Sequence, residues 1–427
     1  MTTVVTPVWV WLPGRDEPVR AGELVSSRGV RFVYGPEFLN TVGALALDPV
    51  ELRLSRSARG VAVLGADGLP GVVRDAKPAG YGADRLQAMH GGRLDALQLL
   101  ELGVPDGVGA IEACHDIERK LQWRPRTLAQ LQQLTDELQE QEPASRALRR
   151  LNDDLDTSAG GERPKATLVH EDALWLVKMQ SRGDRLAMPA REFVTMRLAQ
   201  LAGLYVAPVR LHTFGAHQVL MVRRFDREGD PLKPMRKLYA SAHTVLRLRL
   251  DAVRGDPARS YLALADRLRV WTRDGAADQG ERLAGQWVEL FKRMAFNALV
   301  GNTDDHALNT GLLLDRMVWG LSPAFDITPN VVTPPQKMED GPGLSMATGL
   351  DGHSGTSVAR LAEAAQRLGI DRDDAMQWLR DTARLVAEQW EPMLRAAAAP
   401  VMQDAARMDR LVDDVRPAFA YAQWLAA

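Results

Sequence analysis

The stretch FNALVGNTDDHALNTGLLLDRMVWGLSPAFDITPN, residues 296–330, gives the strongest indication of fold and chemistry in this chain. Three of its oxygen-bearing side chains, those of Asp304, Asn309 and Asp326, lie in polar clusters between apolar segments. Polar clusters held between buried segments are typical of site loops on a rigid scaffold. Transfer of a phosphoryl group from a metal nucleotide needs a carboxylate near the acceptor hydroxyl and oxygen ligands for Mg²⁺. The three side chains are therefore candidates for such a site.

The spacing of these residues agrees with that of protein kinases. Four residues separate Asp304 from Asn309, as they separate the catalytic Asp from the metal-binding Asn in those enzymes. A second acid, Asp326, follows in Ala-Phe-Asp where protein kinases carry Asp-Phe-Gly, and Ile327 replaces the Gly. A polar loop with capping side chains has the same pattern. The spacing alone therefore leaves a phosphotransferase and a purely structural loop both open.

Length and composition are those of an ordinary globular protein. The chain has 427 residues, of which 46% are hydrophobic and 25% charged, enough for two or three domains with substantial cores. The formal net charge of −2 argues against a surface that coats nucleic acid. Cys114 is the only cysteine, which excludes an intrachain disulfide and a thiolate metal cluster. Without a leader-like N-terminus or an apolar run of roughly 18 residues, we expect a cytoplasmic protein that binds no membrane.

The first part of the chain is expected to be rich in strands and turns. Residues 7–56 contain short runs of strand composition, among them 30–34 and 51–54, with glycines between them. Residues 60–109 are rich in Gly and Pro, which predicts loops and a few short helices. Residues 127–141 place leucines on one face and begin with a threonine suited to cap an amphipathic helix.

Residues 157–165, TSAGGERPK, are a candidate phosphate-binding loop. Small residues and glycines let backbone N–H groups approach phosphates, although the Walker pattern is absent and a hairpin turn has the same composition. The apolar run 173–178 predicts a strand that ends in Lys178, where kinases place a lysine that pairs nucleotide phosphates. Glu192 lies on a helix expected over 190–201 and could hold Lys178 in position. A surface ion pair, worth about 0–1 kcal/mol, is the alternative.

Two further strands are expected over 206–211 and 219–222, and the second runs into RRFDR, residues 223–227. In a two-lobed kinase this segment would be the hinge. It would supply backbone groups for adenine, an aromatic side chain against its face and a carboxylate near the ribose. Taken alone, the motif could equally be a charged strand end.

The last part of the chain predicts helices over 357–368, 371–388 and 391–418, with Pro400 as a break. Arginines between residues 247 and 273 make the middle of the chain locally basic. Acidic residues lie among them, so a solvated helix face is favoured over a nucleic-acid site.

Taken together, the segments resemble the HipA family of serine/threonine kinases, the toxins of HipBA toxin–antitoxin pairs. The matching segments are SAGGERPKA (158–166), WLVK (175–178), EFVTMRLAQLAGL (192–204), RFDR (224–227), FNALVGNTDDHALN (296–309) and LSPAFDITPN (321–330). Their order and spacing agree with the family over almost the whole chain, more weakly before residue 60.

The resemblance implies an α+β, two-lobed, protein-kinase-like (HipA) fold. It would have a small β-rich N-terminal subdomain and a mainly helical C-lobe. We place the N-terminal subdomain at residues 1–120, the kinase N-lobe at 121–226 and the C-lobe at 227–427.

By the same resemblance, Asp304 would be the catalytic base, and Asn309 and Asp326 would bind Mg²⁺. His306 would contact the nucleotide or the acceptor, with a structural histidine as the alternative. ATP would be held by Lys178, by the loop residues Ser158, Ala159, Gly160, Gly161 and Lys165, and by the hinge residues Arg223, Phe225 and Asp226. In this family the loop serine can be autophosphorylated, which expels the loop and inactivates the kinase, and Ser158 matches that position. Two added negative charges beside nucleotide phosphates would repel strongly.

The implied activity is transfer of the γ-phosphate of Mg-ATP to a protein serine or threonine. The implied target is an aminoacyl-tRNA synthetase such as glutamyl-tRNA synthetase, and the outcome arrested translation. A HipB-like DNA-binding antitoxin would neutralise the chain and link it to operator DNA. Asp305 and Leu308 stand where some members have Gly and Lys, and Arg223 where the hinge is often acidic. The change at Leu308 removes a basic residue near the acceptor, which weakens any transfer of target identity.

Two other functions stay open. A small-molecule kinase would use the same site on another hydroxyl. A kinase-like corepressor would act only as a binding module. The intact set of Asp304, Asn309, Asp326 and Lys178 counts against the second of these, because a scaffold does not need all four.

Overall fold

The computed structural model describes residues 3–27, 29–57, 59–63, 68–132, 158, 165–179, 186–214, 217–330 and 335–427. The chain forms two compact units, each assembled from separate segments. Unit 1 consists of Met1–Met179, Arg223–Leu250 and Leu312–Trp319, and unit 2 of Gln180–Val222, Asp251–Gly311 and Gly320–Ala427. The three-part division into residues 1–120, 121–226 and 227–427 stays a prediction.

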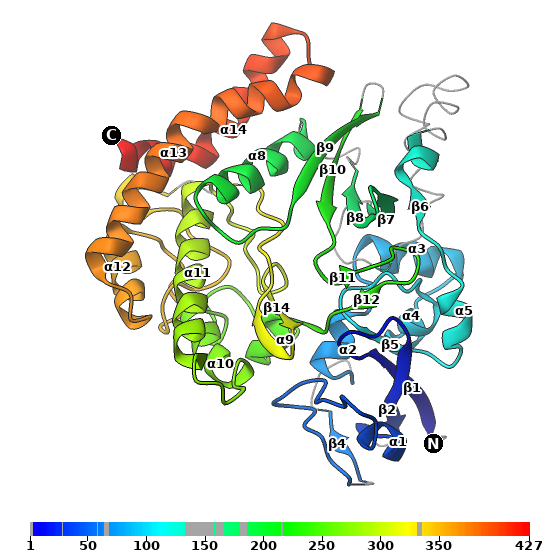
Figure 1. Ribbon diagram of the computed structural model, residues 1–427. Coiled ribbons are helices and arrows are strands. Elements are labelled where there is room, and N and C mark those ends of the chain that lie inside the picture. The colour runs from blue at the N-terminus through cyan, green and yellow to red at the C-terminus, as the bar shows by residue number, and fades with distance from the viewer. Residues whose placement is uncertain are drawn as a thin grey trace. The chain divides into compact units, whose positions relative to one another are not determined.

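Unit 1 begins with an antiparallel sheet in the order β4-β3-β2-β1-β5 (Figure 1). Its strands are β1 (Val4–Trp11), β2 (Pro18–Ser26), β3 (Val30–Tyr34), β4 (Val61–Ala62) and β5 (Ile111–Ala113). Along β1, the buried Thr6, Val8 and Val10 alternate with more exposed neighbours, so one face of the strand enters the core. The β-rich N-terminal region predicted from the sequence is confirmed.

The strand expected over residues 51–54 is wrong. That segment contributes only an isolated bridge between Asp48 and Leu52. The Asp48 carboxylate accepts the backbone N–H groups of Val50 and Glu51, at 2.7 and 2.8 Å. These bonds turn the chain and compete with an extended conformation.

Short helices follow, as expected from the Gly- and Pro-rich composition. They are α1 (Pro36–Leu39), α2 (Gly71–Asp75), α3 (Tyr81–Met89), α4 (Ala96–Leu102) and α5 (Ile117–Leu121). The predicted cap at Thr127 is also confirmed. The Thr127 hydroxyl accepts the N–H of Gln130, and the Gln130 side chain accepts the N–H of Thr127. The predicted helix over 127–141 is described as far as Gln132.

A second group of strands in unit 1 carries the candidate nucleotide residues. β6 (Arg126–Thr127) pairs in parallel with β7 (Lys165–His170), which forms a hairpin with β8 (Ala173–Lys178). Glu171 and Asp172 make the tight turn, with φ of 48° and 53°. The later elements of this unit are β11 (Arg227–Glu228), β12 (Met235–Arg236), β13 (Tyr239–Ser241), α9 (Ala242–Leu246), β14 (Gly311–Asp315) and β15 (Val318–Leu321).

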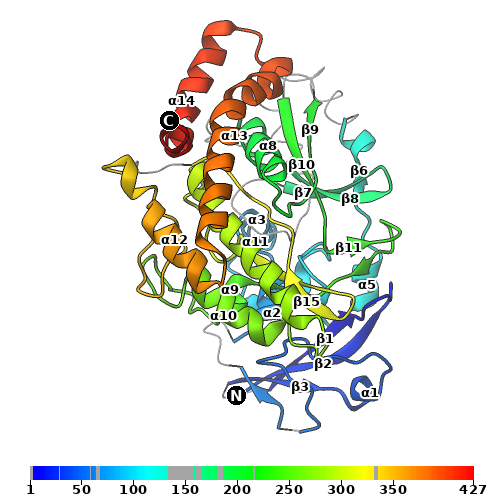
Figure 2. The same ribbon diagram turned by 60° about the vertical axis from the view of Figure 1, so that its left-hand side comes forward.

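Unit 2 is mainly helical. It contains the antiparallel hairpin β9 (Val209–Phe214) and β10 (His217–Arg223). Its helices are α8 (Met188–Leu201), α10 (Tyr261–Trp271), α11 (Gln279–Leu299), α12 (Val358–Arg367), α13 (Arg372–Ala398) and α14 (Ala405–Ala426), with short 3₁₀ turns at Met338–Asp340 and Ala399–Val401. Helix α13 packs against α8 and α14 (Figure 2). None of the described helices has the length and apolar character needed to cross a membrane.

The predicted helices over 190–201 and 357–368 are confirmed by α8 and α12, and Ser357 caps α12. The expected interruption between residues 388 and 391 is wrong, because α13 continues through it. Val386, Trp390 and Leu394 form one buried stripe across this point, so packing on that face holds the helix together despite Pro392. The break predicted at Pro400 is confirmed by the 3₁₀ turn at Ala399–Val401.

Candidate active site

Two lysines lie directly opposite one another in the β7–β8 hairpin of unit 1. The register pairs Lys165, the first residue of β7, with Lys178, the last residue of β8. Residues directly opposite in an antiparallel pair point to the same face of the sheet. Lys165 is buried and Lys178 partly exposed. Two like charges on one face repel each other unless negative groups lie beside them, and the binding of nucleotide phosphates by these lysines stays a prediction.

Ser158 is docked in a buried position of unit 1, with 3% of its surface exposed. Its backbone N–H donates to the Asp106 carboxylate, and its hydroxyl donates to the carbonyl of Val104, both at 2.5 Å. Gly103 makes room for it, because a Cβ at that residue would lie 2.7 Å from the Ser158 hydroxyl oxygen. The predicted loop residues Ala159, Gly160 and Gly161 lie outside the described residues.

The Asp226 carboxylate is held in a buried ion cluster of unit 1. It accepts hydrogen bonds from Arg224 at 2.9 and 2.7 Å, from Arg227 at 2.7 Å and from the N–H of Gly109 at 2.8 Å. Burial by itself raises the pKa of Asp226, but the two guanidinium groups outweigh it and hold the pKa far below its ordinary value. Asp226 therefore joins the chain around Gly109 to the chain after β10.

The other two hinge candidates are more accessible. Arg223 is exposed at the end of β10. Phe225 is partly exposed, and its ring centroid lies 6.2 Å from that of Tyr239. The contacts of Arg223, Phe225 and Asp226 with adenine and ribose stay predictions.

In unit 2, helix α11 ends where the catalytic candidates begin. Gly301, with φ of 59°, terminates the helix after Val300. Its N–H donates to the carbonyl of Ala298, and the N–H of Asn302 donates to that of Asn297. This pairing is a Schellman motif, in which glycine adopts the left-handed conformation at little cost. The motif turns the chain sharply into residues 303–309.

A buried polar network supports this turn. The Asp305 carboxylate accepts the Tyr261 hydroxyl at 2.6 Å and the N–H of Ser345 at 2.5 Å. The Tyr261 oxygen accepts the side-chain amide of Asn297, whose own carbonyl accepts the amide of Asn302. Burial raises the pKa of Asp305 to about 6. Asp305 is thus the inward-facing acid of the Asp304–Asp305 pair, and its hydrogen bonds to Tyr261 and Ser345 hold the backbone of the turn in place.

Asp304 faces outward, with 64% of its side chain exposed. His306 Nε2 lies 3.9 Å from an Asp304 carboxylate oxygen, and the buried His306 Nδ1 has no hydrogen-bond partner among the described residues. The Asn309 side-chain amide nitrogen donates to the Asp304 carbonyl at 3.0 Å, and its backbone N–H donates to the His306 carbonyl. The turn therefore brings the side chains of Asp304, His306 and Asn309 together. It also leaves the amide oxygen of Asn309 for a hard cation such as Mg²⁺.

Asp326 lies in a neighbouring segment of unit 2. It adopts the left-handed conformation, with φ of 58°, which only a few non-glycine residues tolerate. The segment is fixed on both sides, since the Thr195 hydroxyl of α8 donates to the Ile327 carbonyl and Asn330 forms a parallel bridge with Asn302. The Thr303 hydroxyl also donates to the carbonyl of Asn330. The acid segment is therefore tied to the turn that carries Asp304.

The structure does not show the remaining predicted contacts. Glu192 is buried on α8 in unit 2, whereas Lys178 ends β8 in unit 1, so their pairing stays a prediction. Within the described ranges, no three His, Cys, Asp or Glu side chains gather as a metal site. A magnesium site with Asn309 and Asp326 would have to be completed by nucleotide oxygens and water, which is usual for this ion.

Comparison with known proteins identifies the family. The family described as HipA-like C-terminal domain (HipA_C) matches residues 157–390, more than half of the chain. The chain belongs to the HipA-like family. The match includes both the lysine hairpin of unit 1 and the Asp304 turn of unit 2, so the resemblance read from the sequence is confirmed.

Relatives of this HipA-like chain agree with the assignment. "Putative kinase Y4mE" of Sinorhizobium fredii is 26% identical over 233 residues, which are 52% of this chain and 51% of that protein. The chain thus matches that curated relative over about half of its length. The solved structure of Shewanella oneidensis MR-1 HipA, in complex with HipB and operator DNA, has a TM-score of 0.65 at 17% identity and covers 95% of both chains. That likeness confirms the predicted HipA-type α+β fold.

A second solved structure, the Helicobacter pylori proinflammatory kinase CtkA, covers 62% of this HipA-like chain and 93% of its own. Its TM-score is 0.35 at 16% identity. The fold assignment rests on the Shewanella protein.

Several positioning residues of this HipA-like chain were not predicted from the sequence. Asp106 holds Ser158 from about fifty positions away, and no local pattern marks it. Asp305 was noted only as a departure from the family, and no local pattern shows which acid of the Asp304–Asp305 pair faces inward. Arg224 lies within the quoted RFDR motif, yet only its neighbours were given roles. Thr195 sits on the predicted α8 helix without any distinguishing signal.

Proposed function

We propose that this chain is a serine/threonine-protein kinase of the HipA type that transfers the γ-phosphate of Mg-ATP to a protein hydroxyl. The observation that carries the proposal is the turn in which Asp304 exposes its carboxylate while its backbone carbonyl accepts the side-chain amide of Asn309. A structural loop would not need an outward-facing acid supported by a second, buried acid at Asp305. The family membership and the neighbouring Asp326 segment support the same reading.

In the proposed reaction, Asp304 orients the acceptor hydroxyl and takes its proton. The hydroxyl oxygen then forms a bond to the γ-phosphorus as the bond to the ADP oxygen breaks. Mg²⁺, when bound, neutralises charge that develops on the phosphate oxygens. Asn309 and Asp326 would hold it by their oxygens, and Lys178 and Lys165 would orient the phosphates. His306 would contact the nucleotide or the acceptor through its ring nitrogens.

The proposal also includes an antitoxin partner and a protein target. The Shewanella protein was solved with HipB and operator DNA, which supports a HipB-like antitoxin as partner here. We infer a protein target, with an aminoacyl-tRNA synthetase such as glutamyl-tRNA synthetase as first candidate. Leu308 is 54% exposed beside Asn309, so the acceptor side of this turn is apolar at that position. Autophosphorylation at Ser158 and a cytoplasmic location complete the proposal.

The test is transfer of labelled γ-phosphate to proteins of a cell lysate. Asp304→Asn removes the base and should lower transfer by about 10²-fold or more. The matched control is Asp266→Asn, which changes an exposed acid of α10 and should leave transfer unchanged. A labelled protein band identifies the target. Label found only in small molecules would favour a metabolite kinase, and ATP binding without any transfer, in protein verified unmodified at Ser158, would overturn the kinase proposal.

A further inference from the structure

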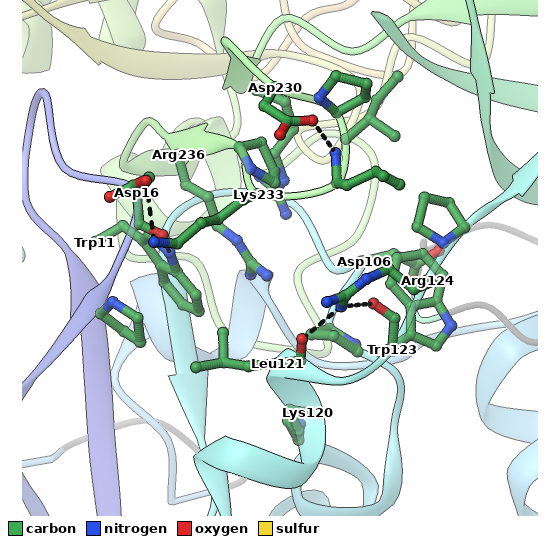
Figure 3. A pocket seen from close by; sticks show the side chains of 18 of the residues that line it. Trp11, Asp16, Asp106, Lys120, Leu121, Trp123, Arg124, Asp230, Lys233 and Arg236 are labelled. Carbon is green, nitrogen blue, oxygen red and sulfur yellow. Dashed lines mark hydrogen bonds and ion pairs between the residues drawn. The ribbon is translucent and has the colours of Figure 1, made fainter.

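A cavity of about 530 Å³ lies within unit 1, and none of its lining residues is among those assigned to catalysis (Figure 3). Its lining comes from β1, α5, β7, β8, the chain at 16–18, 105–106 and 123–125, the loop at 230–234, and three arginines at 224, 227 and 236. Small-molecule sites commonly have volumes of about 300–1,000 Å³. The cavity is therefore large enough for a compact ligand.

Tryptophan rings form the apolar part of its wall. Trp9, Trp11 and Trp123 all line the cavity. The indole N–H of Trp9 donates to the carbonyl of Cys114 at 3.0 Å, and that of Trp11 to the carbonyl of Asp16 at 3.2 Å. Trp9 and Trp123 are partly exposed and offer the cavity apolar surface, whereas the Trp11 ring has 1% of its surface exposed and is covered by Arg236. A planar group packs well on such surfaces.

The inner wall is cationic. Four lining cations have less than a tenth of their side chain exposed: Lys120, Arg224, Arg227 and Arg236. Two carboxylates form ion pairs with these four cations. Glu112 pairs with Lys120 and Arg236, and Asp226 pairs with Arg224 and Arg227.

Asp106 is the one buried acid among the described lining residues, and its carboxylate accepts bonds from Ser158 and Thr167. Burial lowers the pKa of Arg224, but the charges of Asp226 and Asp106 outweigh it and raise that pKa. Three buried carboxylates, those of Glu112, Asp226 and Asp106, therefore face four buried cations and leave the positive charge only partly compensated. Buried charges are normally paired, because an uncompensated one is costly to desolvate.

Arg236 is the group best placed to meet a ligand. Its guanidinium lies 3.7 Å above the centre of the Trp11 ring, and Figure 3 shows the two side by side at the cavity. One of its end nitrogens lies 3.2 Å from Glu112, but its buried Nε has no hydrogen-bond partner among the described residues. Burial lowers the pKa of Arg236, as expected for a cation short of negative partners. An anionic oxygen would satisfy this donor.

The rim limits how much negative charge can enter. Asp16, Glu17, Glu118 and Asp230 line the outer part of the cavity, and Lys233 pairs with the first two. Acids at the entrance repel polyanions such as nucleic acid or a triphosphate. A ligand with one anionic group and a flat ring fits both the rim and the inner wall.

We propose that this cavity binds a small planar organic anion, whose ring packs on Trp9 and Trp123 and whose carboxylate or phosphate oxygen accepts from Arg236. The proposal assigns a ligand site that is separate from the proposed kinase chemistry. It does not depend on Asp304 or on ATP.

Isothermal titration calorimetry of the full chain tests the proposal with three probes that share one ring. Benzoate carries a carboxylate, phenyl phosphate a phosphate, and benzamide no charge. We expect at least one of the two anions to bind, and benzamide to bind more weakly by about tenfold or more. The stronger anion identifies the head group. If neither anion binds, or if benzamide binds equally well, the proposal is wrong.

Variants of the lining residues test whether the probe binds in this cavity. Arg236→Gln leaves Glu112 paired with Lys120 and should weaken anion binding by about tenfold or more. Lys337→Gln removes an exposed cation of unit 2 that does not line the cavity, and should leave the affinity unchanged. Should Arg236→Gln fail to fold by its thermal unfolding curve, Trp123→Ala decides, because it removes a partly exposed ring and leaves the ion cluster intact. Unchanged affinity in a folded Arg236→Gln or in Trp123→Ala would refute the site.

Discussion

The backbone N–H of Ser158 donates a hydrogen bond to the carboxylate of Asp106, whose other oxygen accepts the hydroxyl of Thr167 on β7. Asp106 therefore links Ser158 to the strand that starts with Lys165. The Ser158 hydroxyl is itself buried against the carbonyl of Val104. A phosphate on that hydroxyl would add close to two negative charges beside an existing carboxylate and a carbonyl oxygen. The docked position accepts the unmodified serine and disfavours the phosphorylated one.

A first prediction follows for a charged substitution at this position. Ser158→Glu should leave the docked position, because the added carboxylate meets Asp106 and has no space in a site that is 3% exposed. Amide hydrogen exchange of the peptide containing residue 158 should then become faster. Ser158→Ala is the control, since it keeps the N–H bond to Asp106 and should stay protected. Equal protection in both variants would mean that Asp106 does not discriminate charge at this position.

Gly103 gives a second prediction about the same contact. A Cβ there would lie 2.7 Å from both the Ser158 hydroxyl oxygen and Pro78 Cγ. Gly103→Ala should therefore displace Ser158 and raise hydrogen exchange at its amide, although the backbone at residue 103, with φ of −61°, accepts alanine. Gly92→Ala is the matched control, because nothing lies within 4 Å of the added carbon. If Gly103→Ala exchanges like Gly92→Ala, the close approach is not needed to dock Ser158.

The buried Asp305 predicts a defined pH dependence of stability. Its pKa is raised from 3.8 to about 6, so between these values the folded protein binds more protons than the unfolded chain. The free energy of unfolding should therefore fall as pH rises through this window. Asp305→Asn removes this contribution, so from pH 4 to pH 7 its free energy of unfolding should rise by about 2 kcal/mol relative to that of the native protein.

Denaturant unfolding at several pH values measures the shift. Asp75 is a second buried acid whose burial raises its pKa to about 6, and it is present in both proteins, so its share cancels in the comparison. Asp75→Asn should remove a separate contribution to the free energy of unfolding, which likewise falls as pH rises. A constant difference between native protein and Asp305→Asn across the window would show that Asp305 does not titrate there.

The sequence predicted the residues that meet solvent or substrate better than those that hold them. Asp304 and Asn309 were proposed from local spacing and His306 from the family resemblance, and one short turn carries all three. The Asp305–Tyr261 bond joins positions 44 apart, and the Ser158–Asp106 bond positions 52 apart. Such pairings depend on how the chain folds back on itself, which no local period records. Propensity likewise placed α12 correctly but missed the continuation of α13, where tertiary packing on Trp390 decides.

The sequence and the structure suggest different roles for Asp226. The resemblance implies a contact with the ribose, whereas its carboxylate lies between Arg224 and Arg227 with 3% of its side chain exposed. Asp226→Asn removes the charge and leaves both guanidinium groups uncompensated, which should lower the free energy of unfolding by about 3–5 kcal/mol. Asp230→Asn, a nearby exposed acid whose carboxylate accepts only the N–H of Leu232 among the described hydrogen bonds, should change it by less than about 0.5 kcal/mol. Native-like stability of Asp226→Asn together with weakened ATP binding would contradict the structural role and favour the ribose contact.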